Sequence, residues 1–243
     1  GDVYKRQDHC RRPSICRQPC EQGSGGNGAL WSCFTRTGSR CAEVAQRCVM
    51  LLFKRKVQIA TERLMLRLPL HRDYRSWSEL RLTSKEFLAP WEPSWAADHL
   101  SRKSFANRVY WAQRSVSSGS GIPLFIERKT DGVLLGAVTL DNMRRGPAQA
   151  ATLGYWIGAP YARQGYMREA LTACLNYAFQ KEGLSRLEAA CLPENVASRG
   201  VLEKSGFKYE GVAQSYLQIN GRWRTHVLYA ALRFDRRGRT SAG

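Results

Sequence analysis

The chain has 243 residues, enough for one or two domains around a hydrophobic core of ordinary size. Hydrophobic residues make up 43% and charged residues 24%, close to the average of soluble globular proteins, and no apolar run approaches the ~18 residues that a membrane-spanning helix needs. The sequence therefore argues against a membrane-spanning protein, while the net charge of +18 favours polyanionic partners: nucleic acid, ribosomes, anionic membrane surfaces or a phosphorylated cofactor.

Residues 1–49 are rich in Pro, Gly, Ser, Arg and Cys and show no apolar periodicity. The first methionine is Met50, after which a pattern of strands and helices begins. We therefore expect translation to start at Met50 and residues 1–49 to be an upstream extension without regular structure, with a genuine disordered basic arm as the alternative. Six cysteines lie in this segment: Cys10, Cys16, Cys20, Cys33, Cys41 and Cys48. They include no Cys-x-x-Cys pair, which argues against zinc, and no export signal supports a disulfide module.

The first half of the remaining chain predicts a strand followed by two helices. Residues 63–68 alternate charged and apolar side chains, which is typical of a half-buried strand. Asp73 is placed to cap a helix that runs to about residue 82, and a second helix is predicted over residues 98–116. Residues 117–121 are small and flexible, which predicts a loop.

The second half predicts mostly strands. Strands are expected at residues 123–127, 133–140, 150–157, 186–192, 207–211 and 223–234. A long helix is predicted over residues 166–181 and a short one over residues 197–204. The whole pattern indicates a single mixed α/β (α+β) domain with one sheet.

A strand, a short loop and a helix start follow one another in residues 153–170. The first backbone N–H groups of a helix lack partners and carry a positive partial charge, and a glycine in the loop lets a phosphate approach the backbone. Gly165 and Arg163 fit a pyrophosphate, although a structural turn glycine is the commoner explanation. The P-loop and Gly-x-Gly-x-x-Gly patterns are absent, which argues against nucleotide hydrolysis and hydride transfer.

A second informative segment spans residues 193–207. Asn195 and Ser198 stand at the start of the predicted short helix, where both are good capping residues. Capping explains the residue types, but it does not explain why this segment follows the loop at Gly165.

Together these segments resemble the GNAT superfamily of N-acetyltransferases, within it the RimJ and RimL type. The resemblance extends over about residues 50–236, leaving residues 237–243 as a flexible basic tail. It rests on Glu62-Arg63-Leu64 with Leu66-Arg67, Leu153-Gly154-Tyr155-Trp156-Ile157, Gln164-Gly165-Tyr166-Met167 with Glu169-Ala170, and Asn195-x-x-Ser198 with Gly206-Phe207. The family's fold implies a mostly antiparallel sheet flanked by helices, with a strand splayed at the acetyl-CoA site.

The resemblance also implies roles for individual residues. The backbone of residues 163–167 (Arg163, Gln164, Gly165, Tyr166 and Met167) would cradle the pyrophosphate, and Tyr155, Trp156 and Ile157 would pair with the pantetheine arm. A backbone N–H near Tyr155 would stabilise the oxyanion of a tetrahedral intermediate. Asn195 would bind the pantetheine or thioester end, and Ser198 would protonate the leaving thiolate, with a plain helix-start hydroxyl as the alternative. Ala162 and Met167 depart from the family's usual loop pattern.

The general base and the acceptor site are less clearly marked. Related enzymes carry a carboxylate after the Gly-Phe motif, but residues 214–217 here contain none, so Glu210 and Glu127 become the candidates. For each of them a solvated surface charge is the commoner explanation. Trp91 and Trp95 lie in a Pro-rich loop that in this fold helps form the acceptor site, and they are candidate walls for a peptide.

The expected function is transfer of an acetyl group from acetyl-CoA to the N-terminal α-amine, Ala or Ser, of a ribosomal protein resembling S5, in the cytoplasm near ribosomal RNA. Two alternatives remain: an acetyltransferase for a small amine such as a polyamine, aminoglycoside or amino acid, and a non-catalytic basic RNA-binding module. No membrane partner is expected. No metal is expected either, because the four histidines are scattered without nearby ligands.

Overall fold

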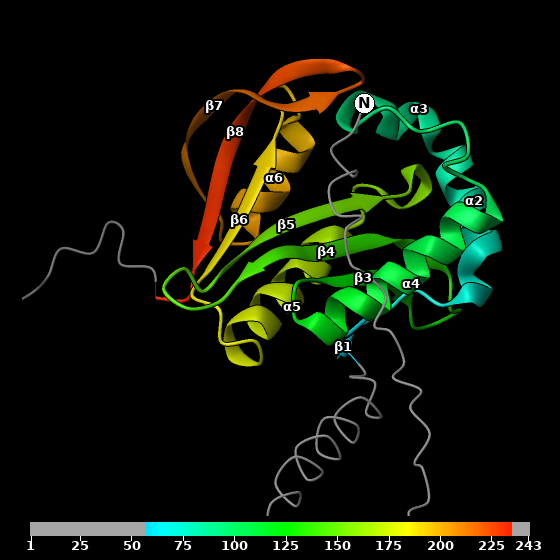
Figure 1. Ribbon diagram of the computed structural model, residues 1–243, viewed down its shortest axis with the longest axis horizontal. Coiled ribbons are helices and arrows are strands. Elements are labelled where there is room, and N and C mark those ends of the chain that lie inside the picture. The colour runs from blue at the N-terminus through cyan, green and yellow to red at the C-terminus, as the bar shows by residue number, and fades with distance from the viewer. Residues whose placement is uncertain (1–56, 235–243) are drawn as a thin grey trace, which may run out of the picture. The chain divides into compact units, whose positions relative to one another are not determined.

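The computed structural model of the chain describes residues 57–234 (Figure 1). The predictions for residues 1–49, their six cysteines, the start at Met50 and the tail at 237–243 lie outside the described residues. Within them, no helix is long and apolar enough to cross a membrane.

The described residues form one sheet of eight strands in the order β1-β2-β3-β4-β5-β6-β8-β7. The strands are β1 (Gln58–Ala60), β2 (Leu64–Arg67), β3 (Ile122–Arg128), β4 (Leu134–Arg144), β5 (Ala150–Ile157), β6 (Arg186–Cys191), β7 (Lys208–Ile219) and β8 (Arg222–Leu232). Every neighbouring pair is antiparallel except β5 and β6, which run parallel. The prediction of a mixed, mostly antiparallel sheet is confirmed.

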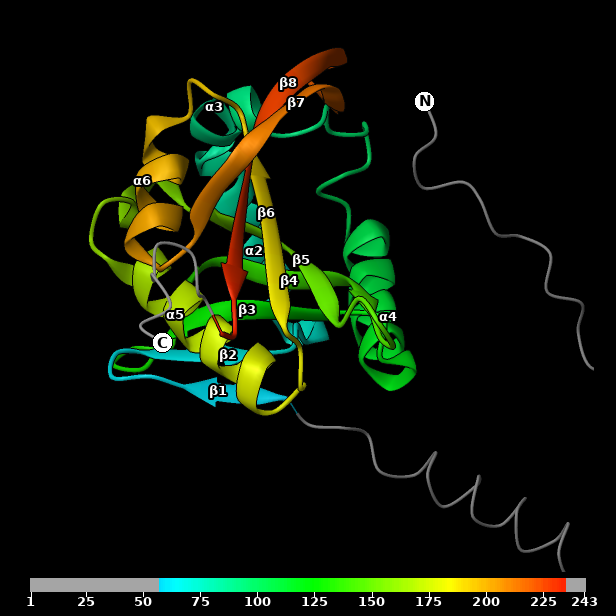
Figure 2. The same ribbon diagram turned by 90° about the vertical axis from the view of Figure 1, so that its left-hand side faces the viewer.

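Helices cover both faces of this sheet. They are α2 (Tyr74–Thr83), α3 (Lys85–Leu88), α4 (Arg102–Ser118), α5 (Tyr166–Gln180) and α6 (Val196–Lys204), with short 3-10 turns at His71–Asp73, Ala89–Trp91 and Ala159–Tyr161. Figure 2 shows α4 on one side of the sheet and α5 and α6 on the other. The larger core lies under α5 and α6, and a smaller aromatic core lies under α2 and α4.

One helix start and one helix cap differ from the predictions, each for a local reason. The second helix begins at Arg102 rather than at residue 98, because the Ser101 hydroxyl accepts a hydrogen bond from the Ser104 N–H at 3.1 Å and caps it there. Asp73 precedes α2 but does not cap it with its side chain. Its carboxylate instead accepts two hydrogen bonds from the Arg67 guanidinium, at 2.7 and 2.9 Å.

We predict that Leu171→Ala strongly destabilises the fold. Leu171 lies on α5 and is fully buried in the larger core. Truncating a buried leucine loses its transfer free energy and leaves a cavity, which costs about 2–5 kcal/mol. Chemical denaturation should show this loss, whereas Leu82→Ala on the exposed face of α2 should change the unfolding free energy by less than about 0.5 kcal/mol. Equal effects of the two substitutions would contradict the described packing of α5.

Candidate active site

An opening between two parallel strands is the central feature of the site. β5 and β6 pair only over three residue pairs, from Ala150 with Arg186 to Thr152 with Glu188. Beyond this point residues 153–157 remain paired with β4, and residues 189–191 remain paired with β8. The edge of β5 that faces β6 therefore presents backbone N–H and C=O groups without a strand partner, which a ligand with amide groups can pair with.

Close packing holds this part of β5 against β4. Gly136 on β4 pairs with Ile157, and a side chain at Gly136 would lie 2.2 Å from the Trp156 carbonyl oxygen. Only glycine permits this approach. β4 thus holds β5 while β6 follows β8, and the two parallel strands diverge.

The loop that follows β5 has an unusual backbone. Arg163 and Gly165 both have positive φ, 62° and 82°, and α5 begins directly after Gly165 with no side chain capping its first N–H groups. The N–H groups of the first turn therefore lack helical partners and sit at the positive end of the helix dipole. Arg163, Gln164 and Gly165 are exposed, while the side chains of Tyr166 and Met167 are buried in the core. This loop can bind an anion through its backbone.

Hydrogen bonds from residues next to β2 hold the loop that precedes α5. Arg63 donates from Nε to Glu169 Oε2 at 2.7 Å and from Nη1 to the Gln164 carbonyl oxygen at 3.3 Å. The Thr61 hydroxyl donates to Glu169 Oε1 at 2.5 Å. Burial alone would raise the pKa of Glu169, but the hydrogen bonds from Thr61 and Arg63 outweigh it and hold that pKa below its ordinary value. The sequence motifs include Arg63 and Glu169, but nothing in their spacing predicts this contact.

Two hydroxyl groups meet across the opening. The Tyr155 hydroxyl on β5 lies 2.7 Å from the Ser198 hydroxyl on α6. Burial raises the pKa of Tyr155 far above its ordinary value, although its hydrogen bond with Ser198 acts in the opposite direction. Tyr155 is therefore a neutral phenol that can donate a proton in a hydrogen bond. Cys191, at the end of β6, is a buried free thiol. Burial raises the pKa of this thiol, although its hydrogen bond with Ser198 acts in the opposite direction.

Asn195 caps α6. Its Oδ1 accepts a hydrogen bond from the Ser198 N–H at 3.0 Å, so the capping role considered from the sequence is real. The cap holds Ser198 at the first turn of the helix, facing Tyr155, and it leaves the amide nitrogen of Asn195 available as a donor.

Both candidate bases are ion-paired with arginines. The Glu210 carboxylate is ion-paired with Arg186, the first residue of β6, where β5 and β6 still pair. Tyr155 is five residues beyond Ala150, the partner of Arg186 in that pairing, and a strand advances ~3.3 Å per residue. Glu127 on β3 accepts hydrogen bonds from Arg67 at 2.8 and 2.5 Å. Glu210 is thus on the paired part of the sheet, and Glu127 is on β3, which β4 separates from β5. Their role as the base stays a prediction.

The two faces of β5 differ at the opening. Side chains alternate along a strand, and Tyr155 and Ile157 pack against the larger core whereas Trp156 packs against the smaller one. Gly154 lies on the Trp156 face, and a Cβ there would meet no atom within 4 Å. A surface hollow of about 500 Å³ is lined in part by Thr152, which shares this face with Gly154 by alternation, and by Glu188 and Tyr216.

The two tryptophans predicted to line the acceptor site belong to a loop that meets the face of β5 carrying Trp156. Trp91 and Trp95 are both half-buried, in the loop between α3 and α4. The Trp95 indole N–H donates to Glu92 at 3.0 Å, and the Glu92 carbonyl oxygen accepts a hydrogen bond from the Asn220 N–H in the β7–β8 turn at 3.2 Å. The loop and the hairpin therefore meet at the end of the sheet where β5 is unpaired.

Comparison with known proteins identifies the family to which the chain belongs. The family described as Acetyltransferase (GNAT) domain matches residues 63–208. The chain belongs to this GNAT acetyltransferase family. It is 33% identical over 175 residues to the [ribosomal protein uS5]-alanine N-acetyltransferase of Escherichia coli, covering 72% of this chain and 90% of that protein.

Solved structures of GNAT acetyltransferases have the same fold. The ribosomal-protein-S5-alanine acetyltransferase of Vibrio fischeri is 28% identical, with a TM-score of 0.69 over 74% of this chain and 98% of that chain. Mycobacterium smegmatis RimJ, in complex with CoA-disulfide, is 30% identical, with a TM-score of 0.68 over 74% of this chain and 88% of that chain. The chain is thus an N-acetyltransferase of the RimJ and RimL type that uses acetyl-CoA.

The residues present fit acetyl-CoA. Its pantetheine arm carries amide groups that match the unpaired edge of β5, and its pyrophosphate matches the exposed, uncapped start of α5. Acetyl-CoA supplies the acetyl group as an activated thioester. Among residues 57–234, no group of three or more His, Cys, Asp or Glu side chains could hold a metal ion.

Proposed function

We propose that this N-acetyltransferase acetylates the N-terminal α-amino group, Ala or Ser, of a ribosomal protein similar to uS5, in the cytoplasm. The names of the E. coli and V. fischeri relatives support the acceptor. The observation that carries the reaction is the unpaired edge of β5 beside the start of α5, with Tyr155 and Ser198 bridging the opening.

We propose that backbone groups, more than side chains, bind acetyl-CoA. The N–H groups of residues 163–167 bind the pyrophosphate, and residues 155–157 pair with the pantetheine arm. An N–H at Tyr155 or Trp156 stabilises the negative charge that develops on the thioester oxygen. The side-chain amide nitrogen of Asn195, which has no hydrogen-bond partner within residues 57–234, hydrogen-bonds the donor near its thioester end.

The leaving sulfur requires a proton, and the paired hydroxyls of Ser198 and Tyr155 are placed to deliver it. The two hydroxyls meet across the opening from β5 and α6, and Tyr155 packs against the larger core, on the face of β5 opposite Gly154. Because Tyr155 stays protonated, it can hold the Ser198 hydroxyl in place through their hydrogen bond. Ser198 then donates its proton to the leaving sulfur and is reprotonated by the proton that the amine loses as the amide forms.

An α-amine needs little help from a base. Its pKa of ~7.7–8 leaves a useful neutral fraction at pH 7, whereas lysine has a pKa of ~10.4. The ion-paired state of Glu210 and Glu127 is therefore compatible with an α-amine acceptor and less compatible with lysine.

We predict that Ser198→Ala lowers kcat about 10-fold, less than the ~10²–10⁴-fold contribution of a complete acid–base group because Tyr155 remains. The KM for acetyl-CoA should stay within about twofold of wild type. Initial rates of thiol release measure both quantities. Ser117→Ala, on the exposed side of α4, is the control. An unchanged kcat for Ser198→Ala would show that Ser198 serves only as a helix-start hydroxyl.

The proposed function is tested by thiol release from acetyl-CoA with a panel of acceptors. The panel contains peptides with free N-terminal Ala, Ser or Met, the same peptides N-blocked but containing lysine, and polyamines. We expect release with free N-terminal Ala or Ser alone. Release with polyamines or blocked peptides would replace the proposal with a small-amine or lysine enzyme. No release with the free Ala and Ser peptides, despite acetyl-CoA binding, would contradict the proposed acceptor.

A further inference from the structure

A buried arginine on α2 joins β5 to the loop between α3 and α4. Arg81 is only 5% exposed, and its guanidinium lies between two indole rings, 4.4 Å from the Trp95 ring centre and 4.7 Å from that of Trp156. Nη1 and Nη2 donate to Glu92 Oε1 and Oε2 at 2.8 and 2.5 Å. We call Arg81, Glu92, Trp95, His99 and Trp156 the Arg81 cluster.

The cluster fixes the Glu92 carboxylate but does not saturate it. Oε2 accepts hydrogen bonds from Arg81 and from the Trp95 indole, whereas Oε1 accepts one, from Arg81, among the described residues. A carboxylate oxygen can accept about two hydrogen bonds, and the Glu92 side chain is 20% exposed. Oε1 therefore has room for one further donor that arrives from solvent.

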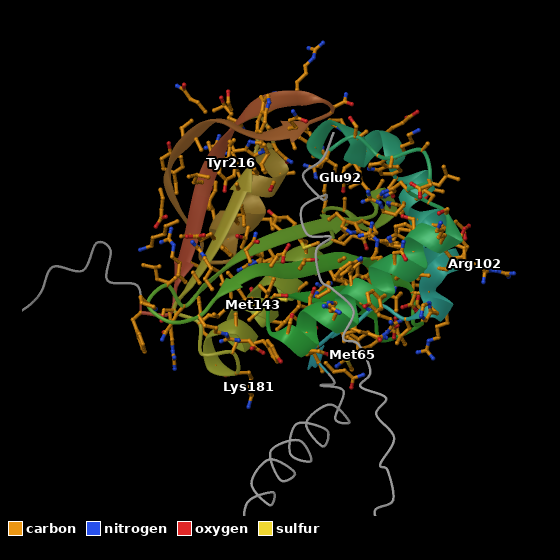
Figure 3. All side chains as sticks on the ribbon, in the orientation of Figure 1. Met65, Glu92, Arg102, Met143, Lys181 and Tyr216 are labelled. Carbon is orange, nitrogen blue, oxygen red and sulfur yellow. The ribbon has the colours of Figure 1, made fainter. Side chains whose placement is uncertain are left out.

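Glu92 lies beside the face of β5 that carries Gly154 and Trp156, which we call the open face of β5. Its partner Arg81 stacks on Trp156, which belongs to the unpaired stretch and shares a face with Gly154, where the space above the backbone is open. On its other side the Glu92 backbone contacts Asn220 in the β7–β8 turn. Figure 3 shows Glu92 between α3 and the tip of this hairpin.

Other charges near Glu92 leave it as the anionic group of the cluster. Burial, together with the positive charges of Arg81 and Arg108, lowers the pKa of His99 to about 4, so that His99 is neutral at pH 7. Glu188 and Glu194, two further carboxylates near the opening, are ion-paired with arginines on the sheet and are more exposed than Glu92.

The cluster is poorly explained by stability alone. The Arg81 Nε is buried and has no hydrogen-bond partner among the described residues, and such an orphaned donor costs free energy. A buried ion pair can often be replaced by apolar side chains without loss of stability. What the ion pair provides, and apolar residues would not, is a carboxylate held in one orientation at the open face of β5.

We propose that Glu92 Oε1 accepts a hydrogen bond from the amino group of the acceptor, and that Arg81 is the positioning residue that holds Glu92 for this contact. This inference rests on the proposed function for the nature of the acceptor. An amine is the matching ligand because it donates N–H groups when neutral and carries a positive charge when protonated, and a carboxylate binds both forms. A fixed carboxylate at this point orients the amine toward the unpaired stretch of β5.

The test compares Glu92→Gln and Arg81→Lys with wild type, using whichever acceptor in the panel gives wild-type turnover. We expect each substitution to raise the KM for the acceptor roughly 10- to 100-fold, as for loss of a hydrogen bond to a charged group, while the KM for acetyl-CoA stays within about twofold. The control is Glu182→Gln, which alters another buried carboxylate bound to an arginine, Arg145, away from the opening. It should leave both KM values at the wild-type level.

A second measurement separates binding of the amine from a general structural role. The affinity of the CoA-bound enzyme is measured for a peptide with a free N-terminal Ala and for the same peptide without its α-amino group. We expect wild type to prefer the amine at least about 10-fold and Glu92→Gln to lose most of that preference.

The proposal is overturned if Glu92→Gln, folded and with normal acetyl-CoA binding, keeps the wild-type KM for the acceptor or the wild-type preference for the amine. Turnover with a polyamine in place of a peptide would instead refute the α-amine function. The effect of Glu92→Gln on the KM for that polyamine would still decide the role of Glu92.

Discussion

Gly154→Leu is expected to abolish most turnover while leaving the fold and acetyl-CoA binding intact. A Cβ at Gly154 meets no atom within 4 Å, so the strand accepts a side chain, and leucine suits a strand better than glycine does. The leucine would project into the space beside Trp156. We assign this space to the acceptor because Arg81, the partner of Glu92, stacks on Trp156. Displacing a reacting group by about 1 Å costs on the order of 10²-fold in rate, so we expect a loss of at least about 100-fold in kcat/KM for the acceptor.

Thiol release with varied acceptor measures the loss, and direct titration with acetyl-CoA measures donor binding. Gly154→Ala provides the graded control, because its methyl group fills less of the space and should give a smaller loss. A Gly154→Leu variant with wild-type turnover would show that the acceptor approaches from elsewhere. Loss of acetyl-CoA affinity would show instead that this face of β5 belongs to the donor site.

Gly165→Val is expected to remove most acetyl-CoA affinity. Gly165 has a φ of 82° directly before α5, a conformation that a β-branched residue adopts only as an outlier. The loop must then change shape, and its N–H groups no longer converge on the pyrophosphate. Each hydrogen bond to a charged group contributes ~1.5–3 kcal/mol, so losing two of them raises the Kd for acetyl-CoA by at least about 100-fold.

Gly183→Val is the matched control for this substitution. Gly183 also has a positive φ, 67°, but it lies just after the end of α5. Both variants introduce similar backbone strain and should lose similar amounts of stability in thermal unfolding. Only Gly165→Val should change the Kd for acetyl-CoA in a binding titration, and equal losses of affinity would argue against a phosphate site at the start of α5.

The sequence predicts the elements that carry strong local signals. β5 and α5 appear nearly as expected, because β5 is a mostly apolar run and α5 has apolar residues at helical spacing. The three residues of β1 carry no such pattern and were not predicted. β7 was expected to end at residue 211 but continues to Ile219. Its second half was missed because register shifts near Gly211 and between Ala213 and Leu217 interrupt the alternation of its side chains.

In the candidate site, too, the sequence predicts the local motifs but not the contacts between distant residues. The loop at Gly165 and the cap at Asn195 are local motifs, so their places follow from spacing along the chain. The meeting of Tyr155 with Ser198 joins residues 43 positions apart. The contact of Arg81 with Trp156 likewise depends on how α2 packs against β5. Residue propensity and hydrophobic periodicity do not predict such contacts. For that reason the sequence suggested Glu210 as a candidate base but did not point to Glu92 as a residue of the acceptor site.

Amide hydrogen exchange with and without acetyl-CoA tests most directly whether the opening between β5 and β6 is the donor site. The account predicts slower exchange on binding in a peptide covering residues 153–157 and in a second peptide covering the loop at residues 163–167, because the donor supplies partners for these amides. Protection confined to the hollow beside α5 that is lined by Ala60, Thr172 and Asn176, with residues 153–157 unchanged, would contradict it.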